Sequence, residues 1–449
     1  MTFRFVPSRG PIVVALLLAV VVSASCGGQS ADAGVPAHTP SSAVVRSTSG
    51  TLNIPAPDAS DPPKATVEEQ RAFMMKSARG AWNYVTREAS RTGFVGATKE
   101  YPYLTVWDMA SGLAAAYSAR ELGFINTTQY KSIVNRTLAS MEKLTLFDKA
   151  AYNRLYSAKN GAMVDSKAQP SKTGMGWSAL DHGRMLVWLK LIANSDPSFA
   201  PRANRIATRV DMGRLVKNGY MQGEEILDKS EHRAYQEGRV GYEQYAAEGF
   251  ALWGAKVDSA LDFAINGKPV TVHGQSIITD VRGMDVMTSE PFVMMGLELG
   301  WKNANWRNLS LSVLAAQEAR YKKEGIVTMV SEDAIPVPPA YFYYYLLYHE
   351  GKPFVVTTVA GVTSDTFPRW VSAKAAFGYH ALAPSAYTWL ALQTVQHGGS
   401  ARGWTAGVYE GTKTSTSQYN LNTAAIVLES AAYMKRGCPF IQTVCQKKR

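Results

Sequence analysis

A succession of helix-like segments constrains the fold of this chain more than any other feature of its sequence. From Thr66 onward, apolar residues recur at helical spacing, and alternately short and long loops separate the segments. Thr66-Val-Glu-Glu69 has the spacing of a capping box and marks the first helix start. The predicted helices span residues 66–90, 105–122, 127–145, 178–194, 203–217, 240–254, 256–265, 289–302, 304–323, 371–383, 384–397 and 420–436.

Twelve helices without a heptad seam predict an all-α fold of six helical hairpins, the six-hairpin toroid or (α/α)6 barrel. The inner helices would begin near residues 105, 178, 240, 289, 371 and 420, with all six N-termini at one end of the barrel. A site at that end would be built from the loops that enter these helices. Two segments depart from the helical pattern. Residues 268–280 alternate as a small β-hairpin insertion, and the aromatic stretch 338–351 predicts an extended segment that lines a cleft.

The first 25 residues have the pattern of a signal peptide, with Arg4 and Arg9 before a short apolar run and small residues after it. VSASCGG resembles a lipobox that would make Cys26 a lipidated N-terminus; the alternative is an ordinary signal peptide with an incidental cysteine. The sequence thus predicts an exported, periplasmic or cell-envelope lipoprotein with a lipid anchor in the membrane. The composition of residues 26–64 predicts a flexible tether, and residues 65–449 are predicted to form one domain of the catalytic type.

The remaining cysteines and the charge refine this interpretation. Cys438 and Cys445 lie close together at the C-terminus, where a disulfide is reasonable outside the cytoplasm. The 47 Lys and Arg residues exceed the 36 Asp and Glu residues, but they are scattered, so no nucleic-acid partner is predicted. HExxH, CxxC, GxSxG, P-loop and Rossmann motifs are absent, so we expect neither a metal nor a cofactor.

Acidic residues recur where the inner helices begin. They are Asp108, Asp181, Glu237, Glu243, Glu290, Glu332, Asp333 and Glu410. Each is individually compatible with a capping role, since the helix dipole favours acids in a first turn. Capping does not explain the accompanying aromatics Trp107, Trp177, Tyr242, Phe292, Trp404 and Tyr409. Carboxylates mixed with flat aromatic rings favour carbohydrate, and glycoside hydrolysis requires two carboxyl groups.

Some of these residues admit two interpretations. Glu237 precedes its helix, so capping is less natural for it, and Arg239 could pair with it or bind substrate. Glu243 lies on the helix, where a structural hydrogen bond is as reasonable as contact with sugar. For His182 and the tyrosines of residues 341–345, packing is the favoured interpretation.

The ordered motifs WDMAS, GWSALDHGR, QEGRVGYEQYAAEGF, TSEPF, SEDAIP, KAAFGYHAL, GWTAGVYEG and LNTAAIVLE resemble those of domain of unknown function 3131, a family of bacterial envelope proteins. The resemblance covers residues 72–436 and implies no activity. A more distant similarity is to the glucoamylase-like (α/α)6 domains of β-1,2-glucanases and cyclic β-1,2-glucan synthases. Their S-E-[AS]-R-L element is similar to residues 236–240, S-x-x-D-x-G to 178–183, and F-E-Y-L-M-P to 289–292. Their S-E-S-A element is similar to residues 331–334 and G-F-Y-E to 407–410, whereas LNTAAIVLE stands in place of M-A-H-H-Q-G-M.

This similarity implies a glycoside hydrolase or transglycosylase that acts on an envelope or extracellular glucan, for example a β-linked one. Glu237, Glu332 and Glu290 would be the acid and base candidates. Substrate binding would fall to Asp108, Asp181, Arg239, Glu243, Glu410 and the aromatics Trp107, Trp177, Tyr242, Trp404 and Tyr409. Two alternatives remain: a polysaccharide lyase with a Tyr or His base, and a non-catalytic glycan-binding lipoprotein of a polysaccharide export system.

Overall fold

The computed structural model describes residues 65–227, 231–283 and 286–445. The predicted signal peptide, Cys26 and the tether of residues 26–64 lie outside the described residues. Within the described ranges, no helix combines the length and the apolar character that crossing a membrane requires.

Six helices contact one another in a closed ring, in the order α2, α4, α7, α9, α11, α13 and back to α2. They begin close to the six inner starts that the sequence predicts. Their bounds are Val106–Leu122 for α2, Ala179–Ser195 for α4, Tyr242–Ala251 for α7, Glu290–Met294 for α9, Ala373–Leu382 for α11 and Leu421–Arg436 for α13. A π-helical turn, Met295–Leu299, continues α9.

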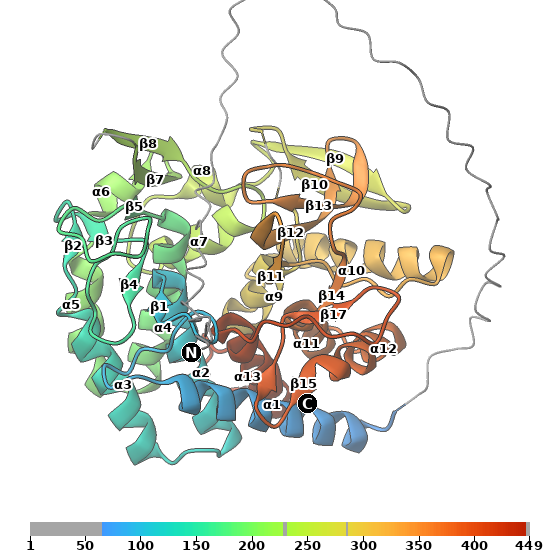
Figure 1. The fold of residues 1–449 in the computed structure, drawn as a ribbon, viewed down its shortest axis with the longest axis horizontal. Helices are drawn as coiled ribbons and strands as arrows, with labels where there is room; N and C mark the ends of the chain where they lie inside the picture. The colour runs from blue at the N-terminus through green and yellow to red at the C-terminus, as the bar shows by residue number, and fades with distance from the viewer. Residues whose placement is uncertain (1–64, 228–230, 284–285, 446–449) are drawn as a thin grey trace, which may run out of the picture.

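Six further helices pack against the ring, one on each member. They are α1 (Val67–Glu88) on α13, α3 (Thr127–Met141) on α2, α5 (Ala200–Thr208) on α4, α8 (Asp258–Leu261) on α7, α10 (Ala304–Glu324) on α9 and α12 (Ala386–Val395) on α11. The short α6 (Met212–Leu215) lies between α5 and the strands that follow. Thr66 completes the predicted capping box with Glu69 at the start of α1. Helices thus make up the larger share of the regular secondary structure in the described ranges (Figure 1).

The structure contains more strand than the single hairpin that the sequence predicts. The hairpin is present as β9 (Gly267–Val272) and β10 (Gln275–Asp280). A three-stranded sheet is formed by β11 (Glu332–Val337), β12 (Ala340–His349) and β13 (Lys352–Thr358). A second sheet joins β5 (Gly176–Trp177), β6 (Val216–Lys217), β7 (Tyr220–Ile226) and β8 (His232–Gln236). In Figure 1, β7–β8 lie at the upper left of the view, and β9–β10 and β12–β13 at the upper right.

The other strands form short pairs. These are β1 (Tyr103–Leu104) with β4 (Tyr156–Ser157), β2 (Leu146–Phe147) with β3 (Ala151–Tyr152), β14 (Trp370–Ser372) with β17 (Gly407–Tyr409), and β15 (Gly399–Ser400) with β16 (Gly403–Trp404). Strands of two or three residues are too short to show an alternation of polar and apolar side chains, which is why the sequence did not predict them.

Glycines allow α4 and α7 to pack closely. A Cβ atom added at Gly249 of α7 would lie 2.0 Å from the carbonyl oxygen of Gly183 on α4. A Cβ added at Gly183 would lie 2.4 Å from Cα of Ala246. Real side chains do not approach backbone atoms this closely, so both positions require glycine at this helix crossing.

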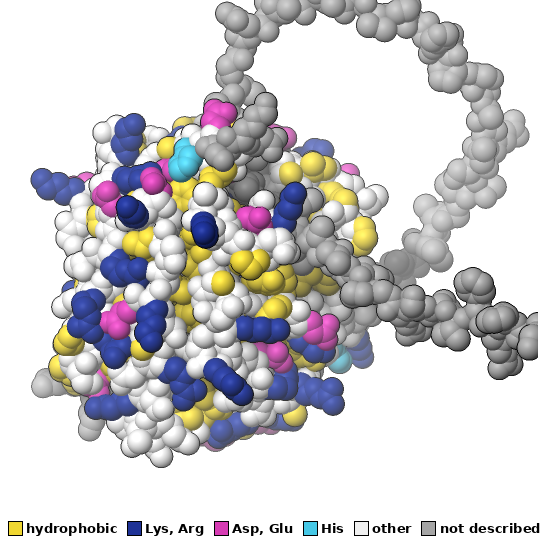
Figure 2. Space-filling view, turned by 60° about the vertical axis from the view of Figure 1, so that its left-hand side comes forward, with side chains coloured by type: hydrophobic (Ala, Val, Ile, Leu, Met, Phe, Trp, Pro, Cys, Tyr) yellow, Lys and Arg dark blue, Asp and Glu magenta, His cyan; other side chains and the backbone are white. Residues whose placement is uncertain are grey.

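The C-terminal segment is fixed to the ring. Cys438 and Cys445 form a disulfide with a Cα–Cα distance of 5.6 Å. Between them, Phe440 packs against Tyr117 of α2 and Trp188 of α4, with ring centroids 5.4 and 5.8 Å apart. At the surface, Figure 2 shows Lys and Arg side chains dispersed over one face with acidic side chains among them.

Gly249→Ala should lower the free energy of unfolding by roughly 1–3 kcal/mol, because the added methyl group would push α7 away from α4. The measurement is urea unfolding followed by circular dichroism. Gly112→Ala in α2 is the matched control, since nothing lies within 4 Å of the place that its added methyl group would occupy. That variant should be neutral or more stable by up to about 1 kcal/mol. Equal effects at the two positions would contradict the close-packing argument.

Candidate functional site

A cavity of about 260 Å³ lies where the ring helices begin. Every ring helix contributes to it through its N-cap or its first turn. The contributing residues are Thr105, Trp107 and Asp108 for α2, Ser178, Leu180 and Asp181 for α4, Tyr242 for α7, Glu290 for α9, Lys374 for α11, and Asn420 and Asn422 for α13. The cavity thus collects six helix N-termini, whose partial positive charge favours acidic groups.

Strand β12 supplies part of the remaining wall. Phe342 and Tyr344 line the cavity, whereas Tyr343 and Tyr345 on the opposite face are fully buried in the main core. The aromatic stretch that was predicted to line a cleft therefore contributes both to the cavity wall and to the core. Successive side chains of a strand point to opposite faces, which separates the two sets.

Glu237 caps a helix, contrary to the interpretation from sequence. Its Oε2 accepts hydrogen bonds from the backbone amides of Ala179, at 2.5 Å, and Leu180, at 3.4 Å. The sequence pattern was misleading because the capped helix is α4, 58 residues earlier in the chain, and not the helix that Glu237 precedes. Burial raises the pKa of Glu237, and Arg154 opposes that rise. Glu237 also lines the cavity.

Asp108 and Asp181 are likewise bound to N-cap residues. Oδ2 of Asp108 accepts from the backbone amide and the hydroxyl of Thr105, each at 2.9 Å. Oδ1 of Asp181 accepts from the hydroxyl of Ser178 at 3.1 Å. Burial raises the pKa of Asp108. For Asp181, burial and the neighbouring carboxyl groups of Glu237 and Asp108 raise the pKa to about 7.

Glu290 is held by three donors. Nζ of Lys374 donates to Oε2 at 2.5 Å, and the Tyr242 hydroxyl donates to the same oxygen at 3.2 Å. Nδ2 of Asn422 donates to Oε1 at 2.7 Å. Lys374 also donates to the backbone oxygen of Glu332 at 2.6 Å. Both Glu290 and Lys374 are almost completely buried, so each depends on the other for charge compensation.

Glu332 begins β11 and lines the cavity in a partly buried position. Burial and the negative charge of Glu290 raise the pKa of Glu332 to about 8, although Lys374 opposes the shift. Its neighbour Asp333 accepts from Nε1 of Trp370 at 2.8 Å, and burial raises the pKa of Asp333 to about 6. At neutral pH, Glu332 is therefore mainly protonated and able to donate a proton.

The structure brings most of the predicted site residues together. Those that line the cavity are Trp107, Asp108, Asp181, Glu237, Arg239, Tyr242, Glu290 and Glu332. Arg239 directs its guanidinium to Oε1 of Gln236, at 2.8 Å, and to the backbone oxygens of Gly238 and Arg282, at 2.6 and 3.0 Å.

Two predicted acidic residues lie outside this cavity. Glu243 is fully buried and accepts from Arg282 at 2.6 Å and from Gln236 at 2.8 Å. Glu410 accepts from Arg320 at 3.0 Å and from the Tyr345 hydroxyl at 2.7 Å. Both carboxylates are bonded to structural partners and are absent from the lining of the cavity, so their predicted contact with substrate stays a prediction.

Four of the aromatics singled out in the sequence also belong to the packing and not to the cavity. Trp177 donates through Nε1 to the Gln222 backbone oxygen at 3.0 Å, and Trp404 donates to that of Ser77 at 3.0 Å. Tyr409, on β17, packs against the main core. Phe292 is fully buried in that core. An aromatic residue that is close to an acidic residue in the sequence can therefore lie either in the packed core or in the wall of the cavity.

Several cavity residues were missed from the sequence. They include Lys374, Asn422 and Arg154. The first turns of α11 and α13 contain no acidic residue. Because the sequence was searched for acidic residues at helix starts, Lys374 in the first turn of α11 was not considered. Asn422 lies in LNTAAIVLE, the segment that stands in place of the M-A-H-H-Q-G-M element of the glucoamylase-like domains. That difference in sequence could have drawn attention to Asn422.

His182 has the packing role that was favoured. Its Nδ1 lies 2.6 Å from the backbone oxygen of Ser178, and its Nε2 accepts from the amide of Tyr152 at 3.0 Å. Burial lowers the pKa of His182 to about 4.

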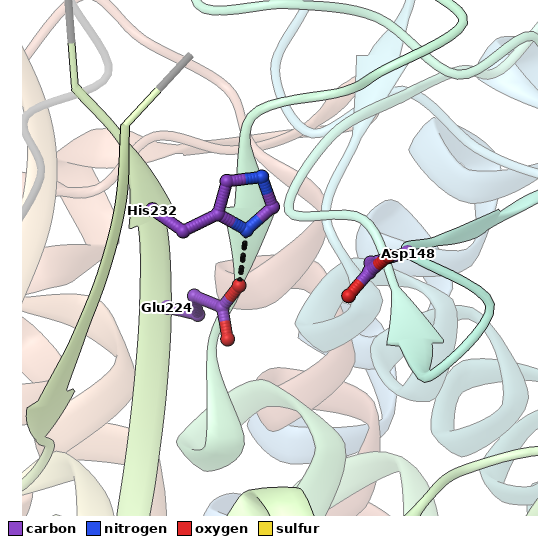
Figure 3. Close-up of side chains that lie close together, drawn as sticks. All are labelled: Asp148, Glu224 and His232. Carbon is purple, nitrogen blue, oxygen red and sulfur yellow. Dashed lines mark hydrogen bonds and ion pairs between the residues drawn. The ribbon is translucent and has the colours of Figure 1, made fainter.

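A second cluster of polar side chains lies away from the cavity, with Asp148, Glu224 and His232 as its members (Figure 3). Nδ1 of His232 lies 2.7 Å from Glu224. The guanidinium of Arg214 pairs with Asp148 at 2.6 Å and with Glu224 at 3.1 Å. Since Arg214 already supplies a cation to both carboxylates, the cluster is an ion-pair network and a poor ligand set for a metal.

Comparison with known proteins places this geometry in context. The sequence model of the family described as "Protein of unknown function (DUF3131)" matches residues 76–437. No protein with a curated description matches the sequence. Among solved structures, a β-1,2-glucanase from Parabacteroides distasonis is similar at a TM-score of 0.58 and 11% identity, over 83% of this chain and 57% of that one.

Two further structures have the same fold similarity. An endo-β-1,2-glucanase from Chitinophaga pinensis, in complex with sophorotriose and glucose, has a TM-score of 0.56 and 12% identity, over 84% of this chain and 97% of that one. An endo-β-1,2-glucanase from Talaromyces funiculosus, in complex with sophorose, has a TM-score of 0.55 and 11% identity, over 82% and 86% of the two chains. At these identities the comparisons establish a shared fold.

The raised pKa of Glu332 makes stability depend on pH. The folded state keeps this proton to about pH 8, whereas the unfolded chain releases it near 4.5. Between these values folding requires proton uptake, so Glu332 destabilises the fold increasingly as pH rises, by up to about 1.4 kcal/mol per pH unit. The stability of Glu332→Gln relative to the wild type should therefore increase as the pH rises from 4.5 to 8. Above pH 8 this difference should stay constant. Urea unfolding at several pH values measures the difference; a flat difference would contradict the assignment.

Proposed function

This chain belongs to the DUF3131 family, and we propose that it is a glycoside hydrolase or transglycosylase whose substrate is a glucan. The observation that carries the proposal is a cavity that combines a carboxyl group of raised pKa, further carboxyl groups and aromatic rings. Glycoside cleavage requires one carboxyl group to protonate the leaving oxygen and another to activate water or attack the sugar. Glu332 and the group of Asp108, Asp181 and Glu237 meet these requirements within one cavity.

Glu332 is the proposed general acid. Its hydroxyl proton would pass to the glycosidic oxygen as the bond from that oxygen to the anomeric carbon breaks. Nζ of Lys374 donates to Glu290 and to the backbone oxygen of Glu332, while burial and the charge of Glu290 raise the pKa of the Glu332 side chain. A carboxylic acid with a pKa near the working pH is suited to this role.

Asp181 is the proposed general base. A pKa of about 7 leaves it substantially ionised at and above neutral pH, so it can take a proton from the attacking water in a hydrolysis. In a transglycosylation the proton would come from an acceptor hydroxyl instead. Glu237 supports this site by fixing the start of α4, from which Asp181 projects. Of the three acid–base candidates from sequence, Glu332 keeps that role, whereas Glu237 and Glu290 become positioning residues.

The remaining lining suits uncharged sugar rings. Trp107, Tyr242, Phe342 and Tyr344 offer aromatic surface in the same cavity. The fold similarity to glucanases, two of them solved with β-1,2-linked glucose oligosaccharides, supports a β-linked glucan as the first substrate to test. A uronate polymer would bring negative charge next to several carboxylates. Burial also raises the pKa of Tyr242 and Tyr344 well above its usual value, so neither suits the base of a lyase.

The architecture and location complete the proposal. The ring of six helices with one packed helix on each supports an (α/α)6 barrel. Residues 1–26 support export and a lipid anchor at Cys26, which would place the cavity in the cell envelope.

The test is to incubate the full chain with β-1,2-glucan and with a panel of other neutral glucans and uronate polymers. Released reducing ends measure hydrolysis, chromatography of oligosaccharides detects transglycosylation, and ultraviolet absorbance detects the unsaturated product of a lyase. Glu332→Gln should reduce turnover at least 100-fold, since removal of a general acid typically costs about 10²–10⁴ in rate.

The matched control is Glu318→Gln on α10, which removes a surface ion pair with Lys322 and should leave turnover unchanged. Full turnover by Glu332→Gln would refute the assignment of the acid. Binding of glucan by the folded wild type without any change in chain length would replace the enzymatic proposal with the binding-protein alternative.

A further inference from the structure

The hydroxyl group of Tyr344 is a polar group of the cavity wall that the proposed acid–base chemistry does not use. Tyr344 lies on β12, lines the cavity and is 8% exposed. Within the ranges that the structure describes, no hydrogen bond joins its hydroxyl to another residue. The hydroxyl oxygen is also not among the polar atoms that are sealed in the interior, so it is accessible from the cavity. Buried polar groups are normally hydrogen-bonded, so an unpartnered hydroxyl at a cavity wall indicates contact with a ligand.

The two neighbouring tyrosines of the same strand have hydrogen-bonded hydroxyl groups. The hydroxyl of Tyr343 donates to the backbone oxygen of Val337 at 2.6 Å and accepts from the amide of Ala340 at 3.2 Å. The hydroxyl of Tyr345 donates to Oε1 of Glu410 at 2.7 Å. Both rings lie on the core face of β12. Of these three consecutive tyrosines, the one on the cavity face is therefore the one whose hydroxyl is left for a ligand.

The pairing of β11 with β12 places Tyr344 beside the proposed general acid. Glu332 and Tyr344 lie directly opposite each other in this antiparallel pair. Side chains in such a position project from the same face of the sheet, with Cβ atoms about 4.5–5.5 Å apart. The ring of Tyr344 packs with Leu346 and Val359, which fixes its direction. Its hydroxyl is therefore held in the part of the cavity where Glu332 would meet the glycosidic oxygen.

The Tyr344 hydroxyl keeps its proton at neutral and mildly alkaline pH. Burial and the surrounding carboxyl groups raise the pKa of Tyr344 well above its usual value. Those carboxyl groups belong to Glu332, Glu290, Glu237 and Asp181. Since a neutral phenol carries one O–H donor, this proton is available to an acceptor on a ligand. A sugar hydroxyl suits this position, because its oxygen can accept from Tyr344 while its own hydrogen is donated to a carboxylate of the cavity.

We propose that the Tyr344 hydroxyl donates a hydrogen bond to a hydroxyl oxygen of the sugar beside the bond that Glu332 protonates. The inference rests on the proposed function, which supplies both the class of ligand and the role of Glu332. This hydrogen bond fixes the sugar relative to the proton of Glu332, and it makes Tyr344 a residue that touches substrate. A deoxy sugar that lacks the hydroxyl would leave Tyr344 unpartnered, so the site selects for a sugar that carries it.

The test is Tyr344→Phe, which removes the hydroxyl and keeps the ring. Binding is measured by titration calorimetry on the full chain, in a Glu332→Gln background that suppresses turnover. The probe is sophorotriose or, if sophorotriose does not bind, the neutral glucan of the panel that does. We expect Kd to rise about 3- to 10-fold, the usual effect of losing one hydrogen bond between neutral groups. In enzyme that retains Glu332, kcat/KM for the cleaved glucan should fall by at least the same factor.

Unfolding in urea separates contact with substrate from a structural role. Tyr344→Phe should not lower the urea midpoint, because it removes no hydrogen bond within the described ranges. Tyr343→Phe is the matched control, since it makes the same change at the adjacent residue of the strand. It removes the hydrogen bonds to Val337 and Ala340, so it should lower the urea midpoint and leave Kd and kcat/KM unchanged. The two variants should therefore show opposite patterns.

Each outcome bears on a different part of the inference. A urea midpoint that falls as far in Tyr344→Phe as in Tyr343→Phe would overturn the role of Tyr344. Cleavage that depends on Glu332, with Kd and kcat/KM unchanged in Tyr344→Phe, would support the proposed function and overturn the role of Tyr344. Binding without cleavage, weakened by Tyr344→Phe, would support the contact of Tyr344 with the sugar and count against the enzymatic function. A folded protein that binds no glycan of the panel would overturn both.

Discussion

The buried contact between Lys374 and Glu290 is the interaction on which the organisation of the cavity depends. Two opposite charges with almost no exposure are costly to bury and tolerable only when each compensates the other. This pair joins the neighbouring ring helices α9 and α11, and a second bond from Lys374 fixes the backbone at Glu332. Burial and the charge of Glu290 raise the pKa of the neighbouring Glu332 carboxyl group, although Lys374 opposes that shift. The contact between α9 and α11 and the electrostatic surroundings of Glu332 therefore share one pair of side chains.

Much of the fold was predictable from the sequence because many of the helices begin at a recognisable capping residue. The six inner starts were located closely, and capping boxes such as Thr105 with Asp108 explain why. The short strand pairs were not predictable, since they owe their existence to neighbours brought close by the ring. The contrast between residues 268–280, which were recognised, and Tyr103–Leu104, which were not, shows how much segment length matters.

The sequence indicated which residues would lie near the site, but it did not indicate which side chains and amides they would bond to. The acids at the starts of α2, α4 and α9 do meet in one cavity. Whether a carboxylate is free for chemistry depends on contacts between distant segments. Glu410 meets Arg320 from 90 positions earlier, and Glu237 meets an amide 58 positions earlier. No local pattern reports such a contact. The capping and catalytic interpretations are also not exclusive, because a cap at a helix entrance lies where substrate would enter.

The alternation along β12 has a consequence for how this family can vary. Tyr343 and Tyr345 fill the core while Phe342 and Tyr344 form the cavity wall, so a shift of one residue in strand register would exchange the two sets. Neither set tolerates that exchange, since one packs against the helices and the other must leave space. Length changes in this region should therefore accumulate at the β12–β13 turn, near Glu350 and Gly351, while the spacing between Glu332 and Tyr344 stays constant. Among family members, that spacing can serve as a marker of a shared cavity even where the side chains differ.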